Sequence, residues 1–381
     1  MVYLDNAATS FPKPDIVADA MSGFIKDIGV NAGRGAYRQA LKADEMVWRT
    51  RSKLAKLFNI NNPQRIIFAA NVTEALNVAL KGLIVNGDHI ITTNMEHNAV
   101  WRPLKRLERE RGIEVTAIPV SVSGEIDYQE LERSIKASTR CIAMLHGSNV
   151  IGNLLPVKSV GAIARRHGVP LVVDAAQTAG CIPIDVADLG IDIFAFTGHK
   201  GLLGPMGTGG LYVGDNLDLE PFKDGGTGGD SILETMPDYL PDRFEAGTQN
   251  LPGIAGLGAA AEYLLEQGIE NIREHERRLL AYAWEELSNV KGLILYGGHD
   301  KVAGVPVITF NIAKLPAEEV AYALDQAYGI MVRSGLHCAP QAHRTIGTER
   351  VGTVRVSFGY FNKEQDIRQL AAALNDISKR V

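Results

Sequence analysis

The sequence has few cysteines, little net charge and no long apolar run. Three cysteines in 381 residues are too few for a disulfide framework and are typical of a reducing compartment. Lysine and arginine number 39 against 44 aspartate and glutamate, so nothing favours nucleic acid or an anionic membrane as a partner. No apolar run is long enough to cross a membrane, and the first fifteen residues lack a signal-peptide pattern. These absences predict a cytoplasmic protein that binds neither nucleic acid nor membrane.

The sequence does contain an alternation of short β-rich runs with helical patterns between about residues 65 and 214. Seven runs have strand character, at 65–70, 88–93, 113–120, 141–147, 170–176, 192–198 and 210–214. Amphipathic segments such as 73–84 and 159–168 lie between them. Apolar strands without strict alternation, separated by helices, predict an α/β fold with a mainly parallel seven-stranded sheet covered by helices on both faces.

A loose, Gly- and Pro-rich stretch at 215–250 interrupts this alternation and is typical of a functional loop. Two long helical patterns follow it, and strands and helices then alternate again to the end of the sequence. The chain length suits two domains. We therefore predict a large α/β domain over 14–252 and a smaller α+β domain formed by 1–13 and 253–381.

Lys200 follows an apolar run and has Thr197, His199 and several glycines beside it, neighbours that a surface lysine does not need. A free lysine has a pKa of about 10.4 and is almost wholly protonated at pH 7. Burial behind an apolar strand would lower this pKa and supply the neutral amine that attacks a carbonyl group. The pattern favours a lysine that bonds to a carbonyl cofactor.

Other polar residues end the predicted parallel strands, which is where ligands bind in such sheets. Asp174 ends one strand, and Thr73 begins the helix after another, where free N–H groups and a hydroxyl favour a phosphate. Each has an ordinary alternative, because Asp174 suits a helix cap and Thr73 is common helix-start chemistry. A cofactor with a carbonyl, a phosphate and a pyridinium nitrogen would use both together with Lys200. Pyridoxal phosphate is that cofactor.

Two further strand-to-helix junctions carry His97 and Asn149. A lone histidine at a helix start is more often structural than catalytic. The glycine-rich run at 204–210 lacks the G-x-G-x-x-G spacing and leads into a strand instead of a helix, which excludes a dinucleotide site.

The chain as a whole resembles the class V aminotransferase family of fold type I pyridoxal-phosphate enzymes. Within that family it is most similar to the cysteine desulfurases with a short catalytic-cysteine loop (group II). The motifs that carry the resemblance are "YLDNAATSFPKP", "NAGRGAYRQA", "NVTEALN", "EHNAVWRPL", "SNVIGN", "VDAAQTAG", "TGHKGLLGPMGTG", "FEAGTQN", "RSGLHCAP" and "RVSFGYFN". The resemblance implies a desulfurase that converts L-cysteine to L-alanine.

The resemblance assigns a cofactor role to each matching residue. Lys200 would bond covalently to pyridoxal phosphate, and His97 would stack on its ring and shuttle protons. Asp174 would pair with the ring nitrogen, and Gln177 would contact the phenolic oxygen. The residues implied to bind the phosphate are Thr73, Thr197, His199 and, from the other subunit, Thr248. The role of Thr248 implies a homodimer with shared active sites.

Substrate roles also follow from the resemblance. Asn149 and Arg355 would hold the substrate carboxylate, although the sequence pattern alone favours Arg355 as a strand-surface residue. Cys338 would attack the substrate sulfur and keep it as a persulfide for an acceptor protein that the sequence does not identify. Arg333 and His337 would favour the Cys338 thiolate if they lie close in space. Cys141 and Cys181 are expected to be structural.

Several alternatives stay open at this stage. Selenocysteine lyase activity, or another class V lyase or aminotransferase reaction, would use the same cofactor. A metal site or thiol hydrolase built from His337, Cys338 and His343 fits common zinc patterns poorly, and a scaffold without catalysis would not need Lys200. Leu336 and the segment 340–348 depart from the group's usual pattern and leave the subgroup and the sulfur acceptor open.

Overall fold

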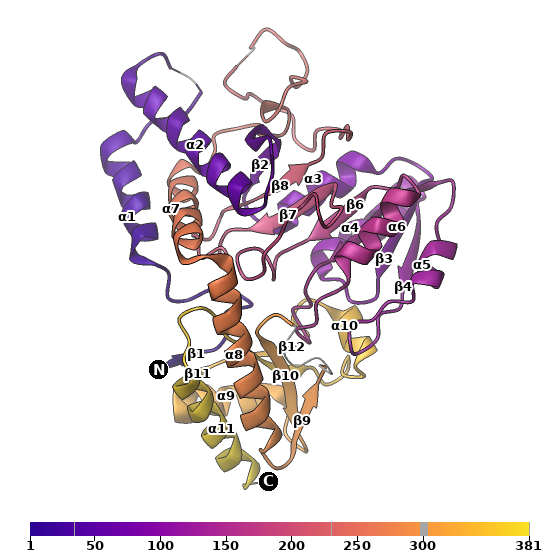
Figure 1. The fold of residues 1–381 in the computed structure, drawn as a ribbon, viewed down its shortest axis with the longest axis vertical. Coiled ribbons are helices and arrows are strands. Elements are labelled where there is room, and N and C mark those ends of the chain that lie inside the picture. The colour runs from indigo at the N-terminus through magenta and orange to yellow at the C-terminus, as the bar shows by residue number, and fades with distance from the viewer. Residues whose placement is uncertain (34, 230, 298–303, 381) are drawn as a thin grey trace.

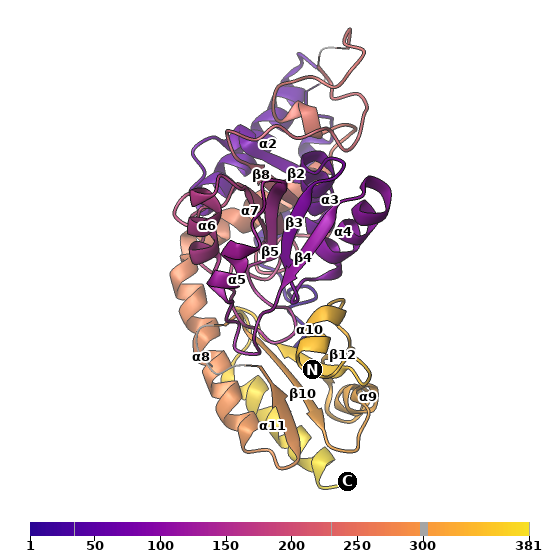
Figure 2. The same cartoon turned by 90° about the vertical axis from the view of Figure 1, so that its right-hand side faces the viewer.

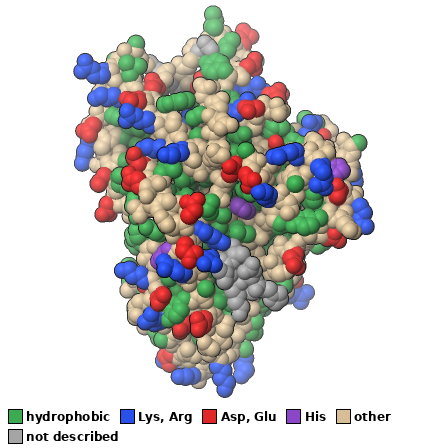
Figure 3. Space-filling model, viewed as in Figure 1, with side chains coloured by type: hydrophobic (Ala, Val, Ile, Leu, Met, Phe, Trp, Pro, Cys, Tyr) green, Lys and Arg blue, Asp and Glu red, His purple; other side chains and the backbone are tan. Residues whose placement is uncertain are grey.

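The structure is a computed structural model that describes residues 1–33, 35–229, 231–297 and 304–380. The molecule is elongated, with a larger sheet and its helices at one end and a smaller sheet and its helices at the other (Figure 1). Both termini lie at the end that holds the smaller sheet (Figure 1). Positive and negative side chains are interspersed over the face in Figure 3, in keeping with the small net charge.

The larger sheet positions the candidate site. Among the described residues it has seven strands in the order β2-β8-β7-β6-β5-β3-β4. Their bounds are β2 Ile66–Ala69, β3 His89–Thr93, β4 Glu114–Ile118, β5 Thr139–Leu145, β6 Leu171–Asp174, β7 Ile193–Thr197 and β8 Gly209–Val213. In this described sheet β8 runs antiparallel to both of its neighbours, β2 and β7, and the other strand pairs are parallel. The predicted mainly parallel seven-stranded sheet is confirmed.

Helices cover both faces of this sheet (Figure 2). The helices α3 (Val72–Leu83) and α4 (Asn98–Arg111) pack on one face, while α2 (Arg38–Leu57), α6 (Val157–Arg166) and α7 (Leu251–Gln267) pack on the other. Successive strand residues point to opposite faces, so Ile90 joins one apolar core and Ile91 the other. Two covered faces explain why these strands are apolar throughout.

The smaller sheet is antiparallel. Within the described residues it has four strands in the order β12-β13-β10-β9, with bounds β9 Leu293–Tyr296, β10 Val307–Ile312, β12 Arg333–Gly335 and β13 Thr353–Ser357. A shared apolar core joins it to α8 (Ile269–Ser288), α9 (Ala317–Tyr328) and α11 (Glu364–Ser378). The N-terminal strand β1 (Val2–Tyr3) pairs with β11 (Ile330–Met331), which brings the first residues beside the C-terminal part.

The remaining elements are short helices and a long connection. Helix α1 (Asp15–Gly23) packs against α7, α5 (Tyr128–Arg133) follows β4, and α10 (Pro340–Thr345) follows Cys338. The predicted loop at 215–250 projects from the end that holds the larger sheet (Figure 1), and its described residues hold only a short 3₁₀ helix, Asp242–Phe244. None of the described helices combines the length and the apolar character needed to cross a membrane.

Candidate active site

Lys200 lies just beyond β7, at the edge of the larger sheet that faces the smaller sheet. Burial lowers its pKa from 10.5 to about 8, although the nearby Asp174 carboxylate opposes this shift. The charges of Arg355, Arg333 and Cys338 also act on Lys200. Polar groups on and beside the smaller sheet therefore lie near Lys200. A substantial fraction of Lys200 is therefore the neutral, nucleophilic amine near pH 8.

Residues near the N-terminus fix the backbone around Lys200. The Ser10 hydroxyl donates a hydrogen bond to the Lys200 carbonyl at 2.9 Å. The carbonyl of His199 accepts from the Ser10 N–H at 3.0 Å and from Lys13 Nζ at 2.8 Å. Nothing in the sequence pattern pointed to these contacts, because the two segments are about 190 residues apart.

Asp174 ends β6 and is almost fully buried. Its Oδ1 accepts a hydrogen bond from the Ala176 N–H at 2.9 Å. Burial raises the pKa of this carboxyl, whereas the Ala176 N–H and the Lys200 charge lower it. Gln177 follows on the next turn, donates to the Ala7 carbonyl at 3.0 Å and lines a small cavity together with Lys200. The structure thus brings Lys200, Asp174 and Gln177 together.

His97 is the N-cap of α4 and shares the site with Lys200. Its Nδ1 accepts a hydrogen bond from the Ala99 N–H at 3.0 Å, which leaves the ring proton on Nε2. Burial, and then the positive charge of Lys200, lower its pKa to about 4. His97 is therefore neutral at pH 7. It caps helix α4 and also lies in the candidate site, near Lys200.

Three of the predicted phosphate ligands lie at the start of α3 or at the end of β7 and just beyond it. Thr197 is buried at the end of β7, and Thr73 is exposed in the first turn of α3. His199 has a buried Nδ1 that makes no hydrogen bond within the described residues, and burial lowers its pKa to about 4. Thr248 is exposed and lines a different cavity, together with Glu74 and Thr208.

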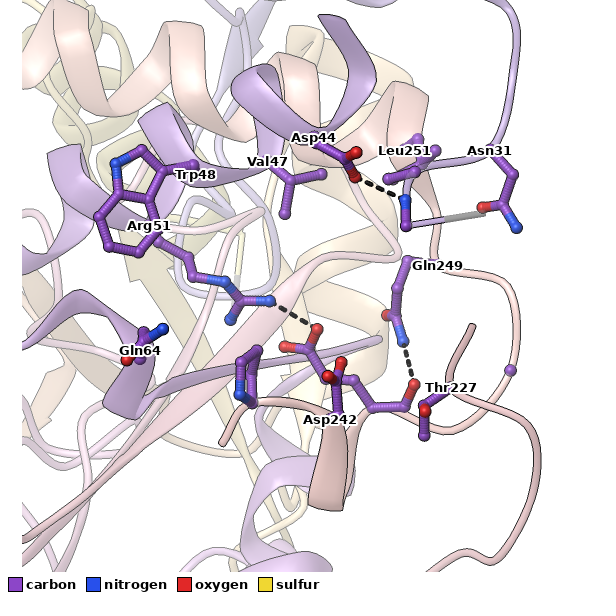
Figure 4. Close-up of a pocket in the computed structure, with 15 residues that line it drawn as sticks. Asn31, Asp44, Val47, Trp48, Arg51, Gln64, Thr227, Asp242, Gln249 and Leu251 are labelled. Atoms are coloured by element: carbon purple, nitrogen blue, oxygen red, sulfur yellow. Dashed lines mark hydrogen bonds and ion pairs between the residues drawn. The ribbon is translucent and has the colours of Figure 1, made fainter. Parts of the chain in front are cut away.

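A buried ion pair holds the segment that carries Thr248. Arg51 of α2 and Glu245 are joined at 2.5 Å, and both are almost fully buried. Glu245 also accepts a hydrogen bond from the Phe68 N–H of β2 at 2.7 Å, and its carbonyl accepts from Gln249 at 3.2 Å. Arg51, Glu245 and Trp48 all line a cavity of about 210 Å³, and Figure 4 shows Arg51 and Trp48 among the residues around it. Thr248 is thereby placed at the rim of the larger sheet.

Arg355 lies on β13 and is only 1% exposed, so the strand-surface interpretation of this residue is wrong. Its Nη2 donates to Asp5 Oδ1 at 2.8 Å, and its Nη1 donates to the Asn149 carbonyl at 3.1 Å. Its Nε is buried and has no partner among the described residues. A fixed guanidinium with an unused N–H suits a carboxylate ligand.

Cys338 is exposed, while Cys141 and Cys181 are buried as expected for structural cysteines. His337 and Cys338 have φ angles of 48° and 59°, a left-handed conformation that costs about 1–3 kcal/mol per non-glycine residue. The Asn149 amide donates to the His337 carbonyl at 2.7 Å, and the Asn98 N–H donates to the Cys338 carbonyl at 2.8 Å. These two bonds hold the strained turn that presents the thiol. Asn149 retains a second N–H for a ligand.

The two residues expected to favour the Cys338 thiolate behave differently. Arg333 Nη2 lies 3.7 Å from Cys338 Sγ, so the guanidinium is close to the thiol in space, as the expectation required. His337 is buried, and its Nε2 contacts Thr353 Oγ1 at 3.1 Å. Burial, followed by the charge of Arg355, lowers the pKa of His337 to about 2. It carries no charge at neutral pH, so the expectation for His337 is wrong.

The alternative site made of His337, Cys338 and His343 does not assemble. His343 is buried and its Nδ1 contacts Thr348 Oγ1 at 2.8 Å. Its ring lies 5.5 Å from that of His337, while Cys338 is exposed. The two imidazoles are buried beside each other, whereas the thiol is exposed and its charge acts on Lys200.

The side chains present fit a flat aldehyde cofactor with a phosphate. They offer a buried amine of lowered pKa, a buried carboxylate beside it and a neutral imidazole. The unpaired Nδ1 of His199 is a buried polar atom that awaits a partner. The amine suits an aldehyde, the carboxylate suits a protonated ring nitrogen, and the unpaired His199 Nδ1 suits a phosphate oxygen.

Comparisons with known proteins agree with this geometry. The family model "Aminotransferase class-V" matches residues 2–370. A probable cysteine desulfurase of Methanothermobacter thermautotrophicus is 37% identical over 99% of this chain and 94% of its own length. A cysteine desulfurase of Yersinia pseudotuberculosis is 35% identical over 100% of this chain and 94% of its own. The apo structure of a cysteine desulfurase from Thermococcus onnurineus superposes with a TM-score of 0.93 at 32% identity, covering 100% of this chain and 95% of that one.

Proposed function

We propose, since the chain belongs to the aminotransferase class-V family, that it is a pyridoxal-phosphate-dependent cysteine desulfurase. It converts L-cysteine to L-alanine and leaves the sulfur on Cys338 as a persulfide. The observation that carries this proposal is the placement of an exposed thiol, beside Arg333, at the site of a buried lysine with a lowered pKa. An aminotransferase would need the lysine but not the thiol.

Pyridoxal phosphate supplies an aldehyde that bonds to Lys200 and a ring that accepts electrons when bonds at the substrate α-carbon break. Asp174 pairs with the ring nitrogen, and the neutral imidazole of His97 stacks on the ring face. Gln177 contacts the phenolic oxygen. The phosphate takes its hydrogen bonds from Thr73, Thr197 and His199, which is supported by the unpaired buried Nδ1 of His199.

The residues of this chain move protons and sulfur as follows. Lys200 removes the α-proton of the bound amino acid, a role that its pKa of about 8 suits near neutral pH. The Cys338 thiolate then attacks the substrate sulfur, so that an S–S bond forms and the bond between carbon and sulfur breaks. The electron pair of the broken bond stays on the β-carbon, which takes a proton, and Lys200 gives a proton back to the α-carbon before alanine leaves. His97 Nε2–H donates the proton that the β-carbon takes.

The substrate carboxylate binds Arg355 and the second amide N–H of Asn149. This role is supported by the buried, unpaired Nε of Arg355 and by the Asp5 carboxylate that fixes its Nη2. The charges of Arg355 and Cys338 act on Lys200, and the charge of Cys338 acts on Arg355, so the three groups share one site. L-Cysteine held by its carboxylate at Arg355 thereby lies with its amino group toward Lys200 and its side chain toward Cys338.

The protein acts as a homodimer in the cytoplasm. Thr248 is exposed on a segment that also exposes Ile232 and Leu233, and in a second copy this segment would bring Thr248 to the neighbouring phosphate. Three free cysteines suit a reducing compartment. A sulfur-acceptor protein takes the persulfide from Cys338, whose exposure leaves the sulfur accessible.

The proposed function is tested by incubating the purified, yellow protein with L-cysteine and a reductant. Equal amounts of alanine and sulfide are expected, because every turnover releases one alanine and the reductant removes one sulfur. Alanine formed only from selenocysteine would replace the proposal with a selenocysteine lyase. A keto acid product without alanine would indicate an aminotransferase.

The lowered pKa of Lys200 makes cofactor binding depend on pH. Between about pH 8 and 10.5 the unfolded chain keeps the lysine proton and the folded chain does not, so the stability of the cofactor-free protein rises with pH over that window. The rate at which cofactor-free protein gains the absorption of bound pyridoxal phosphate should rise with a midpoint near pH 8. A midpoint near 10.5 in stopped-flow absorbance would contradict the burial of this amine.

A further inference from the structure

One fully buried carboxyl group has no part in the chemistry described above. Glu96 is 0% exposed and lies between β3 and α4, directly before His97. Its Oε1 accepts hydrogen bonds from the Thr93 hydroxyl at 2.6 Å and from the Leu145 N–H at 3.1 Å. No ion pair joins it to a lysine or arginine within the described part of the chain. Because a buried carboxyl without a cation is costly, its place needs a reason.

The bond to Leu145 reaches across the sheet to the strands that carry Asp174. Leu145 ends β5 and is the register partner of Asp174 on β6. The next residue, His146, donates its N–H to the Asp174 carbonyl at 2.9 Å. One oxygen of Glu96 therefore links the segment after β3 to the end of β5, which pairs with the end of β6 that carries Asp174.

On its other side, Glu96 leads into two residues of the site. His97 carries the imidazole, and Asn98 donates its N–H to the Cys338 carbonyl at 2.8 Å. We propose that Glu96 is a positioning residue, which clamps the segment of His97 and Asn98 onto the end of β5 and so fixes His97 relative to Asp174. The inference rests on the proposed cofactor roles of His97 and Asp174.

The protonation of Glu96 agrees with this role. Burial raises its pKa to about 8; the Thr93 and Leu145 hydrogen bonds lower it, and the charge of Asp174 raises it further. Its second oxygen, Oε2, is buried without a partner among the described residues, which suits a neutral acid better than a carboxylate. Thr93 and Leu145 bring no charge, and Asp174 is the titratable group that faces it.

The test compares Glu96→Gln, Glu96→Ala and the control Thr92→Val. Glutamine copies the shape of the neutral acid and keeps an oxygen for both donors, so the visible absorption maximum of bound pyridoxal phosphate should equal that of the wild type. Alanine removes both bonds, and we expect a shifted maximum and about 10-fold or greater weakening of cofactor retention. Thr92 makes a similar buried bond from β3 to the Ala143 carbonyl of β5 at 2.8 Å, and its loss should lower the melting temperature without moving the absorption maximum.

Two results would overturn the inference. One is Glu96→Ala protein that melts at a lower temperature but keeps the wild-type absorption maximum and cofactor retention, which would leave Glu96 a purely structural role. The other is Glu96→Gln protein that shifts the maximum as far as the alanine variant, which would show that the ionised form matters. Wild-type protein without any cofactor absorption would instead contradict the proposed function, so the two failures are distinguishable.

Discussion

Replacing Lys200 with alanine should lower the rate of alanine formation from L-cysteine by about 10⁴-fold, the upper end of what a positioned base contributes. The variant loses both the amine that bonds to pyridoxal phosphate and the group that removes the α-proton. Borohydride should fix the cofactor to wild-type protein but leave the variant unlabelled, which mass spectrometry of the peptide around position 200 would show.

The matched control is Lys81→Met. Lys81 lies near the C-terminal end of α3, and burial also lowers its pKa. Its Nζ lies 4.8 Å from the centre of the Phe222 ring, away from the site residues. We expect wild-type rates and normal cofactor labelling. Substantial alanine formation by the Lys200 variant would mean that another group removes the proton, and the role proposed for Lys200 would be lost.

Replacing Cys338 with alanine should lower alanine formation on the order of 10³-fold or more, because Cys338 is the proposed sulfur acceptor and the other two cysteines are buried. The variant should remain yellow, since Cys338 makes no contact that holds the cofactor in this proposal. Chromatographic measurement of alanine, together with an absorption spectrum, separates the two effects. Loss of colour along with activity would mean that the change disturbed the strained turn at 337–338.

Cys141→Ala provides the control for the loss of a thiol. Cys141 is buried in β5, and burial raises its pKa to about 12, so it has no thiolate to offer at neutral pH. This variant should lose some stability and keep its activity. Alanine formation that survives in Cys338→Ala at the wild-type rate would remove the thiol from the mechanism.

Much of the larger sheet was readable from the sequence because its strands are buried on both faces and therefore apolar throughout. The direction of β8 was not predicted, although residues 198–208 are too short a connection for the crossover helix that a parallel strand requires. Strand β9 was missed because its residues 293–296 are half-exposed at a sheet edge, where apolar patterning is weak. The helix α2 was also not predicted, since its mostly polar sequence covers only a narrow buried stripe.

The predicted division near residue 253 stays a prediction. Helix α7 packs against α1 and α2, beside the larger sheet, whereas α8 packs on the smaller one. Gly268 separates the two helices with a φ of 78°. This packing favours Gly268 as the boundary, a position that the helical patterns on either side did not distinguish.

Some residues of the candidate site are marked by local sequence patterns, and others come together only in the folded structure. Lys200, Asp174 and Thr73 could be proposed from the sequence because they end strands or begin helices, while Arg355 and Cys338 needed the resemblance, and the roles of all five stay predictions. Asp5 and Asn98 were missed. Asp5 pairs with a residue 350 positions away, and Asn98 acts through its backbone N–H, so neither leaves a pattern in the sequence.

The central claim is that sulfur passes from L-cysteine to Cys338, and mass spectrometry of the protein after a short incubation with L-cysteine, without reductant, tests it most directly. The account predicts a peptide containing Cys338 that is heavier by one sulfur atom, loses that atom on reduction, and forms in step with one alanine. Alanine released while the Cys338 peptide stays unmodified would contradict it.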